Sequence, residues 1–384
     1  MQVIKGYKVR IYPNKTQEQI LLQTIGACRF VYNHFLEEKK NHYLERKKSL
    51  SYGATSKQLT QLRKETDWLS EIQFQPLQQS LRALDVSYSR FFRKQARFPR
   101  FKSKKDAKQS FRKVTGWKIN GNKISIMDGV SVRFRGTFPQ QREGTLTVLR
   151  DTDGKWYGST TAKMEVKTPK RYVKPIGVDL GLIHLAITSN GEKYENLSVL
   201  NTKKEQQSLS RKKKGSKGRE KARSLLSRKH KKTANIRSNH LHHTSKAITS
   251  KSHVAIVVED LAVKNMVKNH HLARAIVNAS WGEFLRQLKY KQEWRGGKFI
   301  VIDRYFPSSR TCSKCHFVLP VLPLSIREWT CPRCETKHDR DINAAKMLLK
   351  QAGEQLGVET GENSRPLRRS VKVTRSMKLG YVQR

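Results

Sequence analysis

The sequence Ile176-Gly177-Val178-Asp179-Leu180-Gly181 places an acid at the end of an apolar strand, immediately before a glycine turn into a second apolar strand, Ile183 to Thr188. A carboxylate buried in such a run costs free energy unless another group compensates its charge. Asp179 is therefore expected to meet a partner from elsewhere in the chain.

Two more acids stand next to predicted regular structure. The β-branched run Val254 to Val258 ends in Glu259 and follows a predicted helix over 239–249. Further on, Asp341 leads into a helix whose apolar face consists of Ile342, Ala345, Leu348 and Leu349. Acids in a first helical turn are often only partners of the helix dipole, so this third position is a weak signal when taken alone.

The order of these elements carries more information than any one of them. An RNase H-type sheet gathers distant carboxylates from three successive elements, and the same order occurs here. The first acid lies in a strand-hairpin-strand unit, the second ends a strand that follows a helix, and the third leads into a helix. Hard oxygen ligands select Mg²⁺ or Mn²⁺, and two such ions about 4 Å apart can hold both the attacking and the leaving oxygen of a phosphodiester. The three acids together therefore indicate a nuclease metal site.

Four of the five cysteines form a C-x2-C-x15-C-x2-C pattern made by Cys312, Cys315, Cys331 and Cys334. Four thiolates supply a closed tetrahedral shell for Zn²⁺, and a closed shell indicates a structural ion. The module lies between Glu259 and Asp341, so it returns the chain directly to the third acid. His316 and His338 flank it as surplus residues, predicted to be surface groups or neighbours of the ligands.

The charge of the chain points to a polyanionic partner. Lys and Arg number 79 against 31 Asp and Glu, which gives a formal charge of +48. Such self-repulsion favours a nucleic-acid ligand. No apolar run approaches the roughly 20 residues of a membrane span, and Met1 to Arg10 lacks the apolar core of a signal peptide. With paired Cys-x-x-Cys motifs, this predicts a reducing, cytoplasmic compartment and no membrane partner.

The amino-terminal half predicts two interleaved folds. Val3, Tyr7, Val9 and Ile11 alternate with polar residues, as in a half-buried strand. Helical periodicity follows over 15–95, and Cys28 belongs to its apolar face. Short β-prone runs then extend from 113 to 167, separated by Asn120-Gly121, Asp128-Gly129 and Asp153-Gly154. A lone strand cannot stay folded, so the first strand is expected to join this β domain, with a helical bundle inserted.

Two basic stretches suit contacts with phosphates. In Arg97-Phe98-Pro99-Arg100-Phe101-Lys102, bases and aromatics interleave, which is compatible with stacking on nucleobases but also with the edge of a core. Residues 203–232 are dominated by Lys and Arg, which predicts a basic helix that faces a phosphate-lined partner rather than solvent alone.

With the acids and cysteines in view, the sequence resembles the TnpB family, transposon-associated relatives of type V CRISPR effectors. The resemblance covers nearly the whole chain and is carried by four blocks: Tyr7 to Pro13 with Cys28 to Asn33; Phe98 to Lys102; Gly177 to Gly181 with Val258 to Leu261; and the four cysteines followed by Arg340 to Ala345. One departure is His316, where family members usually have glycine; all four cysteines are nevertheless present.

The resemblance implies a RuvC-like nuclease that binds a transposon-end-derived guide RNA. Such an enzyme finds double-stranded DNA by guide pairing beside a short flanking motif and cuts both strands. Carried over residue by residue, the catalytic and Mg²⁺-binding acids are Asp179, Glu259 and Asp341, and the zinc ligands are the four cysteines. Asp339 is a less favoured third acid. The expected assembly is a monomeric ribonucleoprotein in the prokaryotic cytoplasm.

The expected fold class is α/β multidomain: an RNase H-like RuvC domain with an inserted zinc ribbon, and a small β-barrel wedge domain with an inserted helical bundle. The domain boundaries follow as a wedge domain over 1–14 and 106–170, a helical recognition domain over 15–105, a RuvC-like domain over 171–306 and 339–360, a zinc-binding module over 307–338, and a basic tail over 361–384.

Two other functions use the same features. A strand-transferring transposase could employ the same three acids. A DNA-binding regulator could use the basic surface alone, as in relatives that have lost nuclease acids, but this chain retains all three.

Overall fold

The computed structural model describes residues 2–106, 109–139, 144–166, 174–197, 202–251 and 254–356. The chain divides into two compact units, Met1–Lys167 with Leu200–Ile236, and Thr168–Val199 with Arg237–Arg384. Both contain helices and sheet, which confirms the predicted α/β multidomain class. The predicted basic tail over 361–384 lies outside the described residues.

The first unit is built on an antiparallel sheet in the order β2-β6-β7-β1-β5-β4-β3. The strands are β1 (Gln2–Tyr12), β2 (Gln109–Lys113), β3 (Lys118–Asn120), β4 (Lys123–Met127), β5 (Val130–Arg135), β6 (Leu146–Arg150) and β7 (Trp156–Glu165). Although β1 opens the chain, it pairs with β7 along nearly its whole length and with β5 at its end. Gly121, Gly129 and Gly154 adopt positive φ in the turns, as their positions in the sequence predict.

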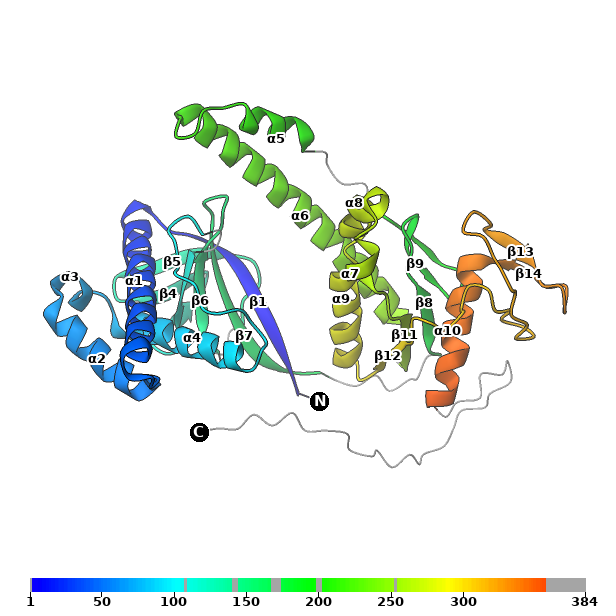
Figure 1. Ribbon diagram of the computed structural model, residues 1–384, viewed down its shortest axis with the longest axis horizontal. Helices are drawn as coiled ribbons and strands as arrows, with labels where there is room; N and C mark the ends of the chain where they lie inside the picture. The colour runs from blue at the N-terminus through cyan, green and yellow to red at the C-terminus, as the bar shows by residue number, and fades with distance from the viewer. Residues whose placement is uncertain are drawn as a thin grey trace. The chain divides into compact units, whose positions relative to one another are not determined.

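Helices inserted between β1 and β2 form the second layer of this unit (Figure 1). They are α1 (Lys15–Arg46), α2 (Tyr52–Glu65), α3 (Asp67–Ser70) and α4 (Phe74–Phe92). Asn14 and Gln17 form a capping box that starts α1. Cys28 is buried against α4, where its thiol donates to the carbonyl oxygen of Pro76 and burial raises its pKa to about 12. Cys28 is therefore a packed core residue, as predicted.

The stretch Arg97 to Lys102 packs on these helices. The ring of Phe98 lies 5.6 Å from Tyr88 and 5.2 Å from Phe91, while the Asn33 side chain bonds both backbone groups of Lys102. Phe98 and Phe101 remain 44% and 48% exposed. The stretch thus combines a core edge with accessible rings, and its contact with nucleic acid remains a prediction.

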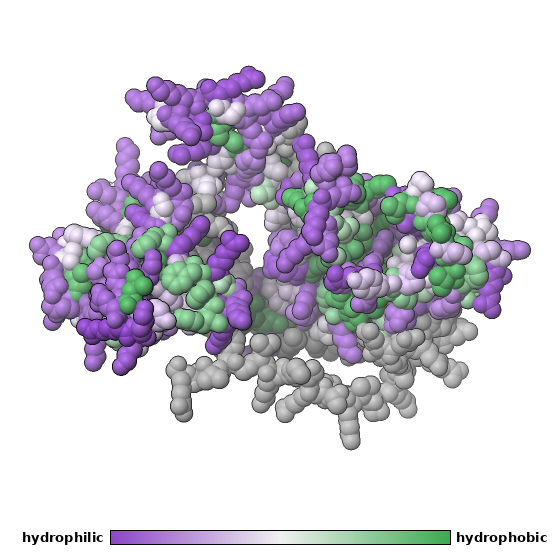
Figure 2. Space-filling view, in the orientation of Figure 1, coloured by the Kyte–Doolittle hydropathy of each residue, from purple (hydrophilic) through white to green (hydrophobic). Residues whose placement is uncertain are grey.

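The basic stretch over 203–232 is helical but is interrupted at 211–216, and its second helix extends well beyond residue 232. After α5 (Lys203–Ser210), α6 runs from Lys217 to Lys251 and passes from the first unit into the second. The hydrophilic side chains that surround its first turns are purple in Figure 2. Lys231 of α6 pairs with Asp151, which follows β6, and Lys229 of α6 pairs with Glu205 of α5. These two acids neutralise only a few of the cations of α6.

The second unit is built on a mixed sheet in the order β10-β9-β8-β11-β12. Its strands are β8 (Ile176–Asp179), β9 (His184–Thr188), β10 (Lys193–Glu195), β11 (Ala255–Glu259) and β12 (Lys298–Ile302). The central strand β11 pairs in parallel with β8 and β12, while β9 and β10 continue as antiparallel hairpins. A small β13 (Glu328–Thr330) and β14 (Lys337–Asp339) ribbon follows the first cysteines.

Helices cover both faces of this sheet. On one face, Ile176, Val178, Ile256 and Val258 pack against the second half of α6, against α8 (His270–Ala279) and against α9 (Trp281–Trp294); α7 (Val263–Met266) lies beside them. On the other face, α10 (Arg340–Leu356) packs on Val257. Because strand residues alternate between faces, Gly177 points toward α10 as well.

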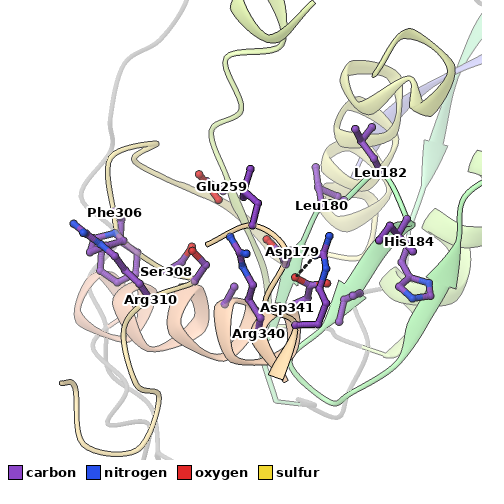
Figure 3. A pocket seen from close by; sticks show the side chains of 18 of the residues that line it. Asp179, Leu180, Leu182, His184, Glu259, Phe306, Ser308, Arg310, Arg340 and Asp341 are labelled. Atoms are coloured by element: carbon purple, nitrogen blue, oxygen red, sulfur yellow. Dashed lines mark hydrogen bonds and ion pairs between the residues drawn. The ribbon is translucent and has the colours of Figure 1, made fainter. Parts of the chain in front are cut away.

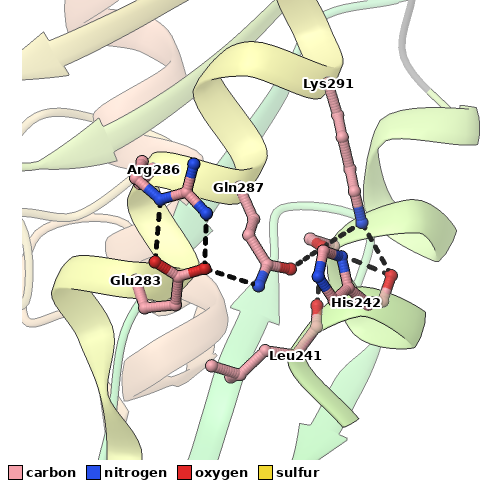
Figure 4. A network of polar contacts seen from close by, with 7 residues as sticks. Leu241, His242, Glu283, Arg286, Gln287 and Lys291 are labelled. Carbon is pink, nitrogen blue, oxygen red and sulfur yellow. Dashed lines mark hydrogen bonds and ion pairs between the residues drawn. The ribbon is translucent and has the colours of Figure 1, made fainter. Parts of the chain in front are cut away.

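A polar network fixes α6 to α9 on the first of these faces (Figure 4). Gln287 is fully buried; its amide oxygen accepts from the Ser245 hydroxyl at 3.0 Å, and its amide nitrogen donates to Glu283 at 3.0 Å. Lys291 donates to the backbone oxygen of His242 at 2.8 Å and to Ser245 at 2.6 Å. These bonds satisfy polar groups that burial would otherwise leave unpaired.

The described helices include none that is both long and apolar enough to cross a membrane.

Gly177 sets the closest approach of helix and sheet in the second unit. A Cβ atom at position 177 would lie 1.9 Å from the backbone oxygen of Ala345 in α10. We predict that Gly177→Ala destabilises the protein by about 3 kcal/mol, the upper part of the usual overpacking range, since backbone cannot move aside as a side chain can. Urea unfolding of the purified protein measures this change.

Gly282→Ala is the matched control, because Gly282 is an exposed α9 residue with no atom within 4 Å of an added Cβ. It should stabilise the protein by about 0.5–1 kcal/mol through helix propensity. Equal unfolding midpoints for Gly177→Ala and the wild type would show that α10 does not pack on Gly177 as described.

Candidate active site and metal centre

Strand alternation places two of the predicted acids on the α10 face. Gly177 and Val257 both face α10. Asp179 and Glu259 each come two residues later on the same strand, so they lie on the same face of the sheet. The parallel register pairs Val258 with Val178, so its next step brings Glu259 level with Asp179. Adjacent strands are about 4.8 Å apart, which makes these carboxylates neighbours at the carboxyl ends of β8 and β11.

The third predicted acid, Asp341, lies in the first turn of α10. It lines one pocket of about 560 Å³ together with Asp179 and Glu259 (Figure 3). All three sequence-predicted acids therefore meet at one site. Their oxygens are gathered less tightly than the cysteine sulfurs described below.

The electrostatics of Asp179 reflect this gathering. Burial, followed by the charges of Asp341 and Glu259, raises the pKa of Asp179 to about 8. The pKa of Glu259 is also raised, by burial and then by the neighbouring Asp260. A site where like charges oppose one another's ionisation is one that a cation would relieve.

Arginines accompany the acids in the pocket. Arg327, which precedes β13, forms an ion pair with Asp341 at 3.4 Å. Arg304 follows β12 and pairs with Asp260 beside Glu259. The side chains of Arg327 and Arg304 are 52% and 41% exposed. Cations of this kind can exchange a carboxylate partner for a phosphate.

Asp339, the less favoured third acid, has another role. Its Oδ1 accepts from the backbone N–H groups of Asp341 and Ile342 at 3.0 and 3.1 Å, and its Oδ2 accepts from Lys193 at 2.6 Å. Burial opposes its ionisation, but the Lys193 bond and these N–H groups outweigh it and lower the pKa of Asp339. Asp339 caps α10 and so orients Asp341.

The four cysteines form a compact centre. All four Sγ atoms lie within 4.8 Å of one another, with 3.6 Å between Cys312 and Cys334 and 3.5 Å between Cys315 and Cys331. Four thiolates about 2.3 Å from a tetrahedral Zn²⁺ stand about 3.8 Å apart, so these side chains fit that ion. Within the described ranges they are the one group of His, Cys, Asp and Glu gathered this closely.

The two halves of the cysteine centre repeat one backbone pattern. The backbone N–H of His316 donates to the carbonyl oxygen of Cys312 at 3.0 Å, and the backbone N–H of Glu335 donates to the carbonyl oxygen of Cys331 at 2.9 Å. Both residues have positive φ, 64° and 55°. A positive φ favours glycine, and the turn forms at position 316 with histidine despite the steric cost.

His338 lies beside the cysteines, whereas His316 is exposed. The Nε2 atom of His338 lies 3.1 Å from Cys312 Sγ, and its ring packs on Trp329. An N–H group at that position can donate to a thiolate. His338 is thus a buried neighbour of Cys312, and its standing outside the ligand set remains a prediction.

Arg340 and Asn343, close to Asp341 in the chain, join the cysteine module to α10. Arg340 donates to the carbonyl oxygen of Pro323 at 2.9 Å. Buried Asn343 accepts from the N–H of Ser313 at 2.9 Å and donates to the carbonyl oxygen of Thr311 at 2.7 Å. Their only sequence signal was membership of the Arg340 to Ala345 block, because their partners are backbone groups about 15–30 residues away.

Three family models match separate parts of the chain. The model described as "Helix-turn-helix domain" matches residues 1–48, the one described as "Probable transposase" matches 159–270, and the one described as "Cas12f1-like, TNB domain" matches 281–348. The range 159–270 contains β8 and β11 with Asp179 and Glu259, and the range 281–348 contains the four cysteines and Asp341.

Curated relatives cover nearly all of the chain. A "Putative RNA-guided DNA endonuclease" of Streptomyces pristinaespiralis is 36% identical over 388 residues, which are 98% of this chain and 95% of that protein. The "Putative RNA-guided DNA endonuclease InsQ" of Escherichia coli (strain K12) is 33% identical over 396 residues, 96% of this chain and 97% of that protein.

Among solved structures, the "Cryo-EM structure of the Cas12f1-sgRNA-target DNA complex" contains a chain with the same fold. It aligns with a TM-score of 0.53 at 11% sequence identity, over 91% of this chain and 99% of that chain. Together with relatives at 36% and 33% identity over almost their full lengths, these matches confirm the resemblance: the chain belongs to the TnpB family.

Proposed function

We propose that this protein is an RNA-guided DNA endonuclease of transposon origin that hydrolyses phosphodiester bonds with Asp179, Glu259 and Asp341. The observation that carries the proposal is the shared pocket: three acids from β8, β11 and α10 meet at the carboxyl ends of parallel strands. Ligands of open α/β sheets characteristically bind at such strand ends. The names of the two full-length relatives supply the guide and the DNA substrate.

The acids fit divalent cations of the Mg²⁺ or Mn²⁺ kind. Carboxylate oxygens are the ligands that these ions prefer, and both causes of the raised pKa of Asp179, burial first and then the charges of Asp341 and Glu259, favour a cation beside it. When bound, such ions supply a Lewis acid that activates water and stabilises the leaving oxygen. Asp179, Glu259 and Asp341 would hold them.

Arg327 is placed to contact either Asp341 or a substrate phosphate. It neutralises Asp341 in this structure. If Asp341 held a cation, Arg327 would be free to bind a phosphate of the DNA, and its half-exposed side chain suits that partner. Arg327 is therefore proposed as a substrate-positioning residue.

The cysteine centre is proposed to hold structural Zn²⁺ and to support α10. All four ligand positions are filled by thiolates, which leaves no open coordination site. Arg340 and Asn343 connect the loops around these cysteines with the helical turn that carries Asp341. Folding of the centre around the ion would thereby hold the third acid in place.

The finer architecture and the partners belong to the same proposal. We assign 171–306 and 339–360 to a RuvC-like domain, 307–338 to a zinc ribbon, 1–14 and 106–170 to a wedge domain, and 15–105 to a helical recognition domain. The charge of +48 suits a guide RNA derived from the transposon end together with double-stranded target DNA. A monomeric ribonucleoprotein is the proposed assembly.

We predict that Asp179→Asn, Glu259→Gln or Asp341→Asn lowers cleavage about a thousandfold or more, since each removes a ligand for ions that contribute several kcal/mol to the transition state. The assay uses the purified protein with its co-purifying RNA, Mg²⁺ and a plasmid that matches the guide. Sequencing that RNA defines the match. Binding of RNA should not change.

The matched control is Glu293→Gln, which changes an exposed acid of α9 outside the pocket and should cut like the wild type. Unchanged cutting by Asp179→Asn would refute the assignment of the acids. Joined strands instead of guide-dependent breaks would favour the transposase, whose name one family model carries. Tight occupancy without breaks would favour a DNA-binding regulator.

Asp339 is predicted to act as a helix cap and not as a metal ligand. Asp339→Ala should destabilise the protein by about 0.5–2 kcal/mol and lower cleavage, because the first turn of α10 loses its cap. Asp339→Asn keeps a capping oxygen and should rescue most of both effects. Were Asp339 a metal ligand, the Asn and Ala variants would lose cleavage equally.

The wild-type protein is predicted to contain a single zinc ion per chain, and Cys331→Ser should lose it and unfold at lower temperature. Elemental analysis and thermal unfolding measure the two effects. Cys28→Ala, which changes the cysteine outside the centre, should retain zinc. A full zinc content in Cys331→Ser would contradict the proposed ligand set.

A further inference from the structure

The loop between β12 and the first cysteine presents an exposed aromatic side chain at the carboxylate pocket. Tyr305 is 85% exposed, more than any other large apolar or aromatic side chain in the described part of the chain. It nevertheless lines the same pocket as Asp179, Glu259 and Asp341. The ring of Tyr305 is therefore accessible to a ligand bound in this pocket.

The backbone that carries Tyr305 is held in place. The Asp303 carboxylate accepts from the backbone N–H of Tyr305 at 2.9 Å, and the carbonyl oxygen of Asp303 accepts from Phe306 at 3.1 Å. On the preceding residue, Arg304 forms its ion pair with Asp260. The loop is therefore a fixed turn, and its ring is presented without a large ordering cost.

The surroundings of Tyr305 combine apolar surface with cations. Leu324, in the same pocket, is 79% exposed, and Val321, three residues earlier in the chain, is 76% exposed. Apolar side chains are visible as green at the surface of the cysteine module in Figure 2. Arg304 and Arg327 supply positive charge in the same pocket. Apolar faces beside cations match a nucleotide, which has a flat base and an anionic phosphate.

A base pair inside a duplex shows only its edges, because its faces are covered by the neighbouring pairs. An unpaired base exposes its faces, and stacking on an aromatic side chain is tolerant of sequence. Such tolerance suits an enzyme whose specificity comes from a guide.

Resting on the proposed function, we infer that Tyr305 is a stacking platform for an unpaired nucleobase beside the phosphodiester that the carboxylates cut. Tyr305 thereby selects a locally single-stranded DNA segment at the active site. It contacts substrate but takes no part in bond breaking.

The experiment measures single-turnover cleavage by the protein with its co-purifying RNA, on target DNA that carries an abasic residue at successive positions around the cut. Tyr305→Ala should slow cleavage of intact DNA about 5- to 150-fold, the range for one stacked base, while Tyr305→Phe should cut nearly as fast as the wild type. At one abasic position the wild type should slow by a similar factor and Tyr305→Ala should slow no further.

Tyr43→Ala, which removes a 55% exposed tyrosine of α1, is the control and should respond to every abasic position as the wild type does. Equal slowing of wild type and Tyr305→Ala at every abasic position would overturn the inference, as would a Tyr305→Phe protein as slow as Tyr305→Ala.

A second measurement separates this inference from the proposed function. Single-stranded DNA bearing 5-iododeoxyuridine is photocrosslinked to the Asp179→Asn protein, and the modified peptide is identified by mass spectrometry. Crosslinking at Tyr305 supports the platform even if no guided cleavage occurs. Guided cleavage by the wild type without crosslinking at Tyr305 upholds the nuclease and removes the platform.

Discussion

Repulsion among three carboxylates is the constraint on which the active-site half of the molecule depends. Asp179 and Glu259 end adjacent parallel strands on the face that α10 covers, and α10 brings Asp341 to the same pocket. Burial and the other two charges raise the pKa of Asp179 to about 8. A protein selected for stability alone would not gather acids in this way, so the arrangement points to a bound cation and to chemistry.

The surrounding structure holds these charges together from several directions. Gly177 lets α10 approach β8 closely, Asp339 caps the helix, and Arg340 with Asn343 fastens its first turn to the cysteine centre. Each contact fixes Asp341 with respect to the sheet. The cysteine centre is therefore coupled to the carboxylate pocket through α10, although none of its four cysteines lines that pocket.

Much of this could be predicted from sequence because the signals are local. Apolar runs that end in Asp179 and Glu259 are strands β8 and β11, and two Cys-x-x-Cys pairs form one centre. The length of α6 was missed because its first half is polar on all sides, which hides helical periodicity. The Arg327 ion pair with Asp341 and the Lys193 bond to Asp339 depend on contacts between distant parts of the chain, which no spacing reveals. The domain boundaries and the catalytic roles remain predictions.

The most direct test of the shared metal site is anomalous diffraction from crystals of the protein grown with Mn²⁺. The account predicts manganese density between the carboxylates of Asp179, Glu259 and Asp341, and Arg327 turned away from Asp341. Manganese bound elsewhere, with these three carboxylates free of metal and Arg327 still paired, would contradict it.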